Sequence, residues 1–316
     1  CLDTRDPEKL IETVLMMHPS FGGINLEDIS QPKCFYILDK LRKESKIPVW
    51  HDDQQGTAAV TLAGLINALK VVDKKMDEVK IVFMGAGASN IRISNLIFQA
   101  GADASGCIMY DSKGSLNKNR SDIFEDPAWE EKAKVCNITN SELFEGPVWE
   151  ALEGADVLIA LSRPGPGTVK KDWISRMAKD PVVFVCANPV PEIWPWEAKQ
   201  AGAAIVATGR SDFPNQVNNS VGFPGIFRGA LDVRAGTITD EMCFAAAAAL
   251  ADYMGDELDA EHILPTMEEP EVFVHRSGRT GRAGRKGASV LLVPTGAERR
   301  VRRVLKLAKI EANWKP

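Results

Sequence analysis

The stretch Glu78-Val-Lys-Ile-Val-Phe-Met-Gly-Ala-Gly-Ala-Ser-Asn90 decides the fold of this chain. An apolar strand is expected at Glu78–Met84 and runs directly into a turn that carries Gly85 and Gly87. A helix is expected to follow at Ala88–Gln99. Strand, glycine-rich turn and helix in this order predict a dinucleotide site, because glycines let the backbone approach a pyrophosphate at the helix N-terminus. A turn with a purely structural role is the alternative.

An acidic residue is expected at the end of the following strand, where it would hold a ribose hydroxyl. Asp111 ends the strand expected at Cys107–Asp111, 26 residues after Gly85. Its charge would repel a 2′-phosphate and so favours NAD, whereas the neighbouring Lys113 keeps NADP open. Asn90 stands where the motif usually has its third glycine or an alanine. The predicted cofactor-binding residues are Gly85, Gly87, Ala88, Ser89, Asn90 and Asp111.

Strands and helices alternate on both sides of this stretch. Further strands are expected at Ala155–Leu161, Val182–Ala187 and Ala203–Ala207, and helices at Thr57–Val71 and Met242–Tyr253. Short apolar strands that alternate with helices are typical of a buried parallel sheet. The sequence therefore predicts the α/β class, with a doubly wound parallel sheet of the Rossmann type.

The first 53 residues have a different pattern. Asp6–Met17 and Lys33–Lys46 are expected to be helical, and Ile47–Asp53 to be a short strand that ends in polar residues. We expect residues 1–53 to be the C-terminal part of an N-terminal domain, residues 54–273 to form the NAD(P)-binding domain, and residues 274–316 to be a short αβ remnant of another domain.

Two pairs of acids stand at loop or strand ends in this N-terminal region. Glu27 and Asp28 form one pair, and Asp52 and Asp53 follow about 25 positions later. Converging carboxylates suit a hard divalent cation, which prefers oxygen ligands. Solvated acids or helix caps are the alternative, and spacing alone does not decide between them.

The composition is that of an ordinary globular protein, with 45% hydrophobic and 26% charged residues. No apolar run is long enough to cross a bilayer, so no membrane contact is expected. The six cysteines form no C-x-x-C pair, which favours buried thiols in a reducing, cytoplasmic setting over disulfides or a zinc site. They are Cys1, Cys34, Cys107, Cys136, Cys186 and Cys243.

Several sequence segments resemble the malic enzyme family, and most closely its short bacterial and archaeal branch. They occur in the family's order from Cys1 to about Phe273. The blocks are Pro19-Ser-Phe-Gly-Gly-Ile-Asn-Leu-Glu-Asp-Ile29, Pro48-Val-Trp-His-Asp-Asp-Gln-Gln-Gly-Thr-Ala58, Ala187-Asn-Pro-Val-Pro-Glu192, Ala207-Thr-Gly-Arg-Ser-Asp-Phe-Pro-Asn-Gln-Val-Asn-Asn219 and Phe223-Pro-Gly-Ile-Phe-Arg-Gly-Ala230.

The resemblance implies an NAD(P)-dependent enzyme that oxidises and decarboxylates malate to pyruvate and CO₂, and that assembles as a homo-oligomer. It implies that Mg²⁺ or Mn²⁺ is held by Glu27, Asp28 and Asp53, with Asp52 supporting acid–base chemistry. It also implies that three asparagines contact malate and the nicotinamide end of the cofactor, although Asn188 taken alone reads as a turn before proline. The asparagines are Asn188, Asn218 and Asn219.

Family members also carry an N-terminal tyrosine and lysine that act as general acid and general base. Neither has a matching position here, since Tyr36, Tyr110 and Tyr253 stand outside the family's motif. A positioned acid or base contributes about 10²–10⁴-fold in rate. We therefore expect this chain to bind cofactor better than it turns over malate, and an inactive hybrid fragment is an alternative reading.

The last residues, 274–316, differ in charge and in resemblance. They hold twelve Lys or Arg and two acids, a balance of +10 that leaves −15 for the rest of the chain. The sequence of residues 274–316 resembles motif VI of DEAD-box RNA helicases, and this resemblance implies that Arg279 and Arg282 contact phosphates. The chain has no G-x-x-x-x-G-K-[ST] loop and no D-E-A-D sequence, so ATP hydrolysis is not expected. Weak RNA binding through the basic residues is the second alternative function.

Overall fold

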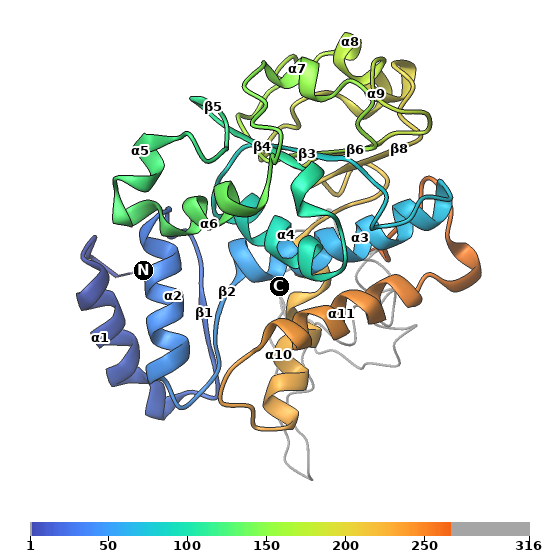
Figure 1. The fold of residues 1–316 in the computed structure, drawn as a ribbon. Helices are drawn as coiled ribbons and strands as arrows, with labels where there is room; N and C mark the ends of the chain where they lie inside the picture. The colour runs from blue at the N-terminus through green and yellow to red at the C-terminus, as the bar shows by residue number, and fades with distance from the viewer. Residues whose placement is uncertain (1, 267–316) are drawn as a thin grey trace.

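The computed structural model describes residues 2–266 and arranges them around two separate β-sheets. A small two-stranded sheet lies in the N-terminal part, and a six-stranded sheet forms the larger part (Figure 1). The expectations for residues 274–316, including the helicase-like motif with Arg279 and Arg282, lie outside the described residues. They stay predictions.

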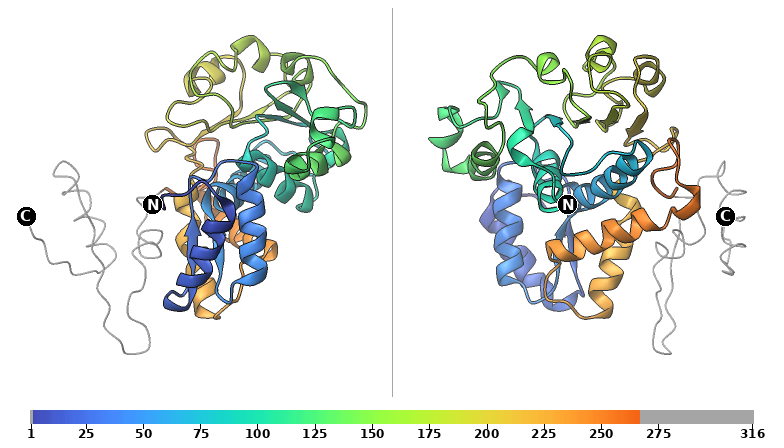
Figure 2. Two further views of the ribbon diagram at one scale, coloured as in Figure 1. Left: turned by 90° about the vertical axis from the view of Figure 1, so that its left-hand side faces the viewer. Right: turned by 45° about the vertical axis from the view of Figure 1, so that its right-hand side comes forward.

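In the N-terminal part, two helices pack beside two parallel strands, as the left view of Figure 2 shows. The first helix begins where the Asp6 carboxylate accepts a hydrogen bond of 2.9 Å from the backbone of Glu8, a standard N-cap. This part has its own apolar cluster, which includes Ile11, Ile37 and Leu41. The elements are α1 (Pro7–Met17), β1 (Ile24–Leu26), α2 (Lys33–Glu44) and β2 (Val49–His51).

The larger sheet has the strand order β5-β4-β3-β6-β7-β8. Its strands are parallel except β5, which pairs antiparallel with β4. The chain runs from β3 outward to β4 and then returns to β6 on the other side of β3. The carboxyl ends of β3 and β6 therefore flank the point where the order reverses, which is where open α/β sheets bind ligands. The strands are β3 (Ile81–Met84), β4 (Ile108–Asp111), β5 (Gly114–Ser115), β6 (Val157–Ala160), β7 (Val182–Val185) and β8 (Ile205–Thr208).

Helices cover both faces of this sheet (Figures 1 and 2). One face packs against α3 (Thr57–Val71) and α4 (Ala88–Gln99), and α11 (Asp240–Asp252) packs on α3. The opposite face carries α7 (Val148–Ala151), α8 (Lys171–Ile174) and α9 (Pro195–Gln200). The remaining α-helices of the described part are α5 (Ser121–Phe124), α6 (Glu130–Ile138) and α10 (Phe223–Asp232).

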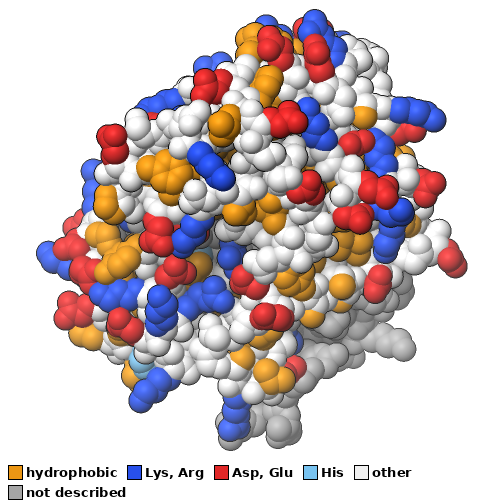
Figure 3. Space-filling model, in the orientation of Figure 1, with side chains coloured by type: hydrophobic (Ala, Val, Ile, Leu, Met, Phe, Trp, Pro, Cys, Tyr) orange, Lys and Arg blue, Asp and Glu red, His pale blue; other side chains and the backbone are white. Residues whose placement is uncertain are grey.

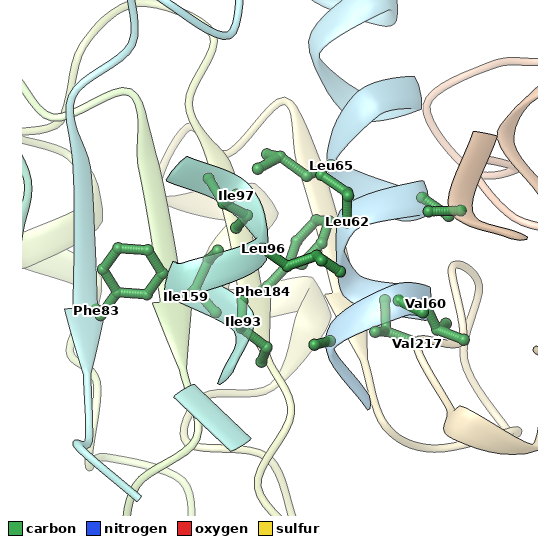
Figure 4. Packing of buried hydrophobic residues seen from close by; sticks show 14 of the residues in the cluster. Val60, Leu62, Leu65, Phe83, Ile93, Leu96, Ile97, Ile159, Phe184 and Val217 are labelled. Carbon is green, nitrogen blue, oxygen red and sulfur yellow. The ribbon is translucent and has the colours of Figure 1, made fainter. Parts of the chain in front are cut away.

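Alternate residues of each strand enter different apolar cores. Phe83 belongs to the core shared with α3 and α4, whereas its neighbour Val82 belongs to the core on the other face. Figure 4 shows Phe83, Ile159 and Phe184 of three strands meeting the side chains of the helices. Since side chains alternate along a strand, a slip of one residue would exchange the two cores, and this fixes the register.

Two buried asparagines fix the end of the described chain. The side-chain amide of Asn67, in α3, donates hydrogen bonds of 2.9 Å to the carbonyls of Ala251 and Ile263. Asn215 donates to the carbonyls of Val206 at 3.1 Å and Ala260 at 2.8 Å. Residues 260–263 are thereby held against the β8 edge of the sheet and the end of α3.

The predicted fold class is confirmed. The helices predicted at Thr57–Val71 and Ala88–Gln99 have the predicted bounds, and the strand predicted at Glu78–Met84 is shorter and begins at Ile81. The antiparallel strand β5 and a π-helical turn at Asp52–Gly56 were not predicted. Both are too short to show a periodic pattern.

The cysteines of the described part are free and buried. Burial raises the pKa of the Cys34 thiol to about 12, so it stays a neutral, small hydrophobic side chain. This confirms the prediction of buried thiols for Cys34, Cys107, Cys136, Cys186 and Cys243. Within residues 2–266, none of the helices has the length and apolar character that a membrane span requires.

Candidate dinucleotide and metal site

A cavity of about 880 Å³ opens at the carboxyl ends of β3, β4 and β6. The glycine-rich turn forms one wall, and the loop after β6 forms another through Leu161, Ser162 and Arg163. This is the point where the strand order reverses. Of the residues predicted to bind a dinucleotide, Gly85, Gly87 and Asp111 line this cavity.

Gly85 and Gly87 have different roles in this turn. Gly85 has φ +103°, and a Cβ there would overlap the carbonyl oxygen of Leu161, so only glycine fits. Gly87 precedes the first turn of α4, and a Cβ there would meet no atom within 4 Å. The first glycine is needed for the fold, whereas the second leaves a free cradle beside the helix N-terminus.

The three residues after the glycines open α4 and tie it to its surroundings. The amide of Asn90, which is buried, donates to the carbonyls of Met84 at 3.2 Å and Gly85 at 2.8 Å. Asn90 therefore braces the turn itself, which explains why a third glycine is not required. The hydroxyl of Ser89 donates to the carbonyl of Asp53 at 2.7 Å and joins the helix to the N-terminal acids.

The carboxylate of Asp111 accepts four hydrogen bonds. Oδ1 accepts from the backbone N–H of Lys113 at 2.9 Å and from Arg120 at 3.1 Å. Oδ2 accepts from Arg120 at 3.0 Å and from Lys132 at 3.2 Å. Burial alone would raise the pKa of Asp111, but the hydrogen bonds from Arg120 and Lys113 and the charge of Lys132 outweigh it and lower the pKa.

The predicted metal ligands lie at one edge of the N-terminal part. The backbone N–H of Asp28, a residue with φ +57°, donates to Oδ2 of Asp53 at 2.9 Å. Oε1 of Glu27 accepts from the amide of Asn25 at 2.6 Å. Within residues 2–266, no three His, Cys, Asp or Glu side chains are drawn together closely enough to hold a metal ion as they stand. The structure thus brings Asp28 and Asp53 into contact without closing a full ligand set.

Asp52 is the one buried residue among the four acids. Its side chain is buried, and Oδ1 accepts a hydrogen bond of 3.1 Å from the indole of Trp50. The pKa of Asp52 is raised to about 6, mainly by burial and also by the charges of Glu27 and Asp53, while the Trp50 hydrogen bond lowers it. A carboxyl group with a pKa near neutrality can both hold and release a proton, as a general acid or base must.

The three predicted asparagines differ in their contacts, and Asn219 is the one with a hydrogen bond to the acids. The amide of Asn219 donates to Oδ2 of Asp52 at 2.8 Å. Asn218 accepts from the backbone N–H of Ser220 at 3.0 Å and caps the short turn that follows. Asn188 is exposed after the carboxyl end of β7, and a Cβ on Gly209 would lie 3.3 Å from its side-chain oxygen.

Some residues of this region were missed in the sequence. Glu192 is fully buried, and its carboxylate accepts from the backbone N–H groups of Ser162 at 2.9 Å and Ala187 at 3.2 Å. It stands in the quoted block at 187–192, but nothing in the spacing marks it as buried. Arg120 and Lys132 carried no signal at all, because their contact with Asp111 depends on how the chain folds back after β4.

Two family models match the chain. The model described as "Malic enzyme, NAD binding domain" matches residues 54–274, and "Malic enzyme, N-terminal domain" matches residues 3–42. The chain is 49% identical over 265 residues to the bifunctional malic/malolactic enzyme of Bacillus subtilis, a match that covers 84% of this chain and 63% of the relative. It is 47% identical to the NAD-dependent malic enzyme of Geobacillus stearothermophilus, over 86% of this chain and 55% of that relative.

Solved structures agree with these matches. The malic enzyme of Entamoeba histolytica superposes with a TM-score of 0.83 at 51% identity, over 97% of this chain and 64% of that one. The malic enzyme of Pyrococcus horikoshii has a TM-score of 0.81 at 45% identity, over 98% of this chain and 71% of that one. The chain spans less than two thirds of the length of these two curated bacterial relatives. With 221 of its 316 residues inside the NAD-binding family model, the chain belongs to the malic enzyme family.

Proposed function

We propose that this protein takes part in the NAD(P)⁺-dependent oxidative decarboxylation of malate to pyruvate and CO₂. The observation that carries the proposal is the direct hydrogen bond between Asp52 and Asn219, at the edge where Ser89 joins the glycine-turn helix to Asp53. These two contacts join Asp52, Asn219 and the first turn of α4, and this supports a shared site. The relatives are named as NAD-dependent and NADP-dependent malic enzymes, which supports the same reaction.

The cavity fits a dinucleotide. Gly87 leaves open space beside the N-terminus of α4, whose free backbone N–H groups favour a pyrophosphate. Asn90 keeps the turn in shape, and Glu192 holds the Ser162 loop at the opposite wall. A bound nicotinamide would accept the hydride from malate, and the residues named here would orient it.

The acids fit a hard divalent cation in the chemistry of their donors. Glu27 and Asp53 both raise the pKa of Asp52, so negative charge is crowded at this edge and a cation would relieve it. Glu27, Asp28 and Asp53 would hold Mg²⁺ or Mn²⁺, which would stabilise negative charge that develops on the substrate oxygens. Asn219 keeps Asp52 oriented, and Asn188 is exposed and free to reach the substrate.

The remaining parts of the proposal concern organisation. We place the boundary between the substrate-side and NAD(P)-binding parts near residues 53 and 54, where the family model for the latter begins. A homo-oligomeric state and a cytoplasmic location are part of the same proposal, the second supported by the buried, unpaired thiols.

Gly87→Ala tests the proposal without disturbing the fold, because the new methyl group would meet no protein atom within 4 Å. It would fill the space beside the helix N-terminus, and we expect dinucleotide affinity to fall about tenfold or more. Binding of NAD⁺ and NADP⁺ is measured by calorimetry, and malate-dependent reduction with Mn²⁺ by absorbance. Gly229→Ala in α10, also free of contacts, is the matched control. Failure of the unaltered chain to bind either dinucleotide would overturn the proposal.

A further inference from the structure

The acid expected to hold the cofactor's ribose has no acceptor position left for it. A carboxylate offers about four lone-pair directions. In Asp111 they are taken by the Lys113 backbone, by two nitrogens of Arg120 and by Lys132. A ribose hydroxyl could reach Asp111 only by displacing one of these donors. The geometry thus argues against the role that the sequence suggested for this residue.

The donors themselves differ in how firmly they are held. Arg120 also donates to Asp122 at 2.8 and 3.1 Å, so its guanidinium is fixed between two carboxylates. Lys132 makes one hydrogen bond to Asp111, and its ammonium lies 4.3 Å from the centre of the Trp129 ring. An ammonium has three N–H donors, so Lys132 retains donor capacity after this bond.

Lys132 lines the cavity, together with Lys113 and Arg163. The acidic side chains in the same wall are Asp111, which is neutralised as described, and Glu145. On the face shown in Figure 3, acidic and basic side chains are interspersed, and neither sign forms a continuous field. Lys113, Lys132 and Arg163 are thus the cations that can select a ligand by charge within the cavity.

We infer that the cavity selects a dinucleotide that carries a 2′-phosphate, with Lys132 as the residue that determines this specificity. Asp111 anchors Arg120 and Lys132 and offers no free oxygen to an unphosphorylated ribose. A 2′-phosphate at the end of β4 would accept the remaining N–H donors of Lys132, a charge-assisted interaction that a hydroxyl cannot match. This inference rests on the proposed function, since it concerns the same cofactor cavity.

The test compares NADP⁺ with NAD⁺ on the full chain by calorimetry. We expect NADP⁺ to bind more tightly, and its advantage to shrink as salt is added, because salt screens the phosphate–cation attraction. Lys132→Met should weaken NADP⁺ binding about ten- to a hundredfold and leave NAD⁺ binding nearly unchanged. Lys132→Arg keeps the charge and should retain the preference for NADP⁺.

Lys134→Met is the matched control, because Lys134 lies on the same helix and pairs with the exposed Glu130 and with Glu131. It should leave the ratio of the two affinities unaltered. Equal or tighter binding of NAD⁺ by the unaltered chain would overturn the inference while leaving the proposed function intact. A folded Lys132→Met variant with an unchanged ratio of NADP⁺ to NAD⁺ affinity would also overturn the inference and leave the proposed function intact. Absence of binding by both dinucleotides would overturn the inference and the proposed function together.

Discussion

The side-chain amide of Asn219 donates a 2.8 Å hydrogen bond to Asp52, across 167 positions of the chain. The acid belongs to the turn that follows β2, and the amide belongs to the loop beyond β8. The indole of Trp50 holds the other oxygen of the same carboxylate. A group proposed to move a proton is thus positioned jointly by residues from two distant parts of the sequence.

The position of Asp52 depends on the absence of a side chain at Gly56. A Cβ there would overlap Oδ1 of Asp52. We expect Gly56→Ala to lower the free energy of unfolding by about 1–3 kcal/mol, as overpacking does. Urea denaturation measures this. Gly229→Ala, in α10 with no atom near the new methyl group, should be neutral or slightly stabilising. Equal effects of the two substitutions would contradict the overlap.

Gly85 combines a left-handed backbone with a close contact, and the two effects can be separated. Gly101 also has positive φ, +108°, but a Cβ there would meet nothing within 4 Å. Gly101→Ala should lower the free energy of unfolding by about 1–2 kcal/mol from backbone strain alone. Gly85→Ala should lower it by about 1–3 kcal/mol more, because the methyl group overlaps the Leu161 carbonyl. Thermal or urea unfolding measures the stability of both variants. A Gly85→Ala variant that is no less stable than Gly101→Ala would refute the prediction.

The buried carboxylate of Glu192 needs both of its oxygens as acceptors. Its Oε1 faces the backbone N–H of Ser162, and Oε2 faces that of Ala187. Glu192→Gln would put an NH₂ group against one of these donors. We expect the free energy of unfolding to fall by about 1–3 kcal/mol, with weaker dinucleotide binding because Ser162 lines the cavity.

The control for this change is Glu153→Gln. Glu153 is exposed and pairs with Arg176 at the surface, where such pairs contribute about 0–1 kcal/mol. Calorimetric binding and urea unfolding are measured on both variants. If Glu192→Gln behaved like Glu153→Gln in both assays, the hydrogen bonds of Glu192 to Ser162 and Ala187 would not contribute to stability or to binding.

The cations around Asp111 make its contribution depend on pH. Its pKa is lowered in the folded state from the ordinary value of 3.8, so its contribution to stability is present above that value. The contribution is lost as the pH falls through the lower folded pKa. Asp111→Asn should therefore reduce the free energy of unfolding by about 1–3 kcal/mol at neutral pH, and the deficit should shrink below about pH 4.

Urea unfolding of the unaltered chain and Asp111→Asn, measured from pH 7 down to pH 3, checks this dependence. The exposed Asp77 provides the comparison, and Asp77→Asn should change the stability little at any pH. A deficit for Asp111→Asn that grew on acidification would have the wrong sign and would rule out the explanation.

The sequence was sufficient for the elements that have strong local patterns. Long apolar helices such as Thr57–Val71 and the strand–turn–helix at Gly85 carry strong local patterns, and the structure has them where predicted. The side-chain partners were out of reach, because they depend on how separate segments meet. Arg120 and Lys132 converge on Asp111 only after the chain folds back beyond β5, and Asn219 meets Asp52 only in the folded molecule.

Asn90 shows a further limit of motif reading. It stands where the motif usually has glycine or alanine, and its amide donates a hydrogen bond that braces the turn. The motif describes which residues usually satisfy a geometric need, and another side chain can satisfy the same need by a hydrogen bond.

The hydrogen bonds from two buried asparagines hold residues 260–263 in a fixed position. Asn67 and Asn215 hold this segment at the β8 edge, whereas the cofactor cavity lies at the ends of β3, β4 and β6. The exposed His262 of this segment lies outside the lining of the cavity and offers a site for attaching a linker. Immobilisation of the protein through a His262→Cys variant, on a sensor surface or a resin, would therefore leave the residues that line the cavity unmodified.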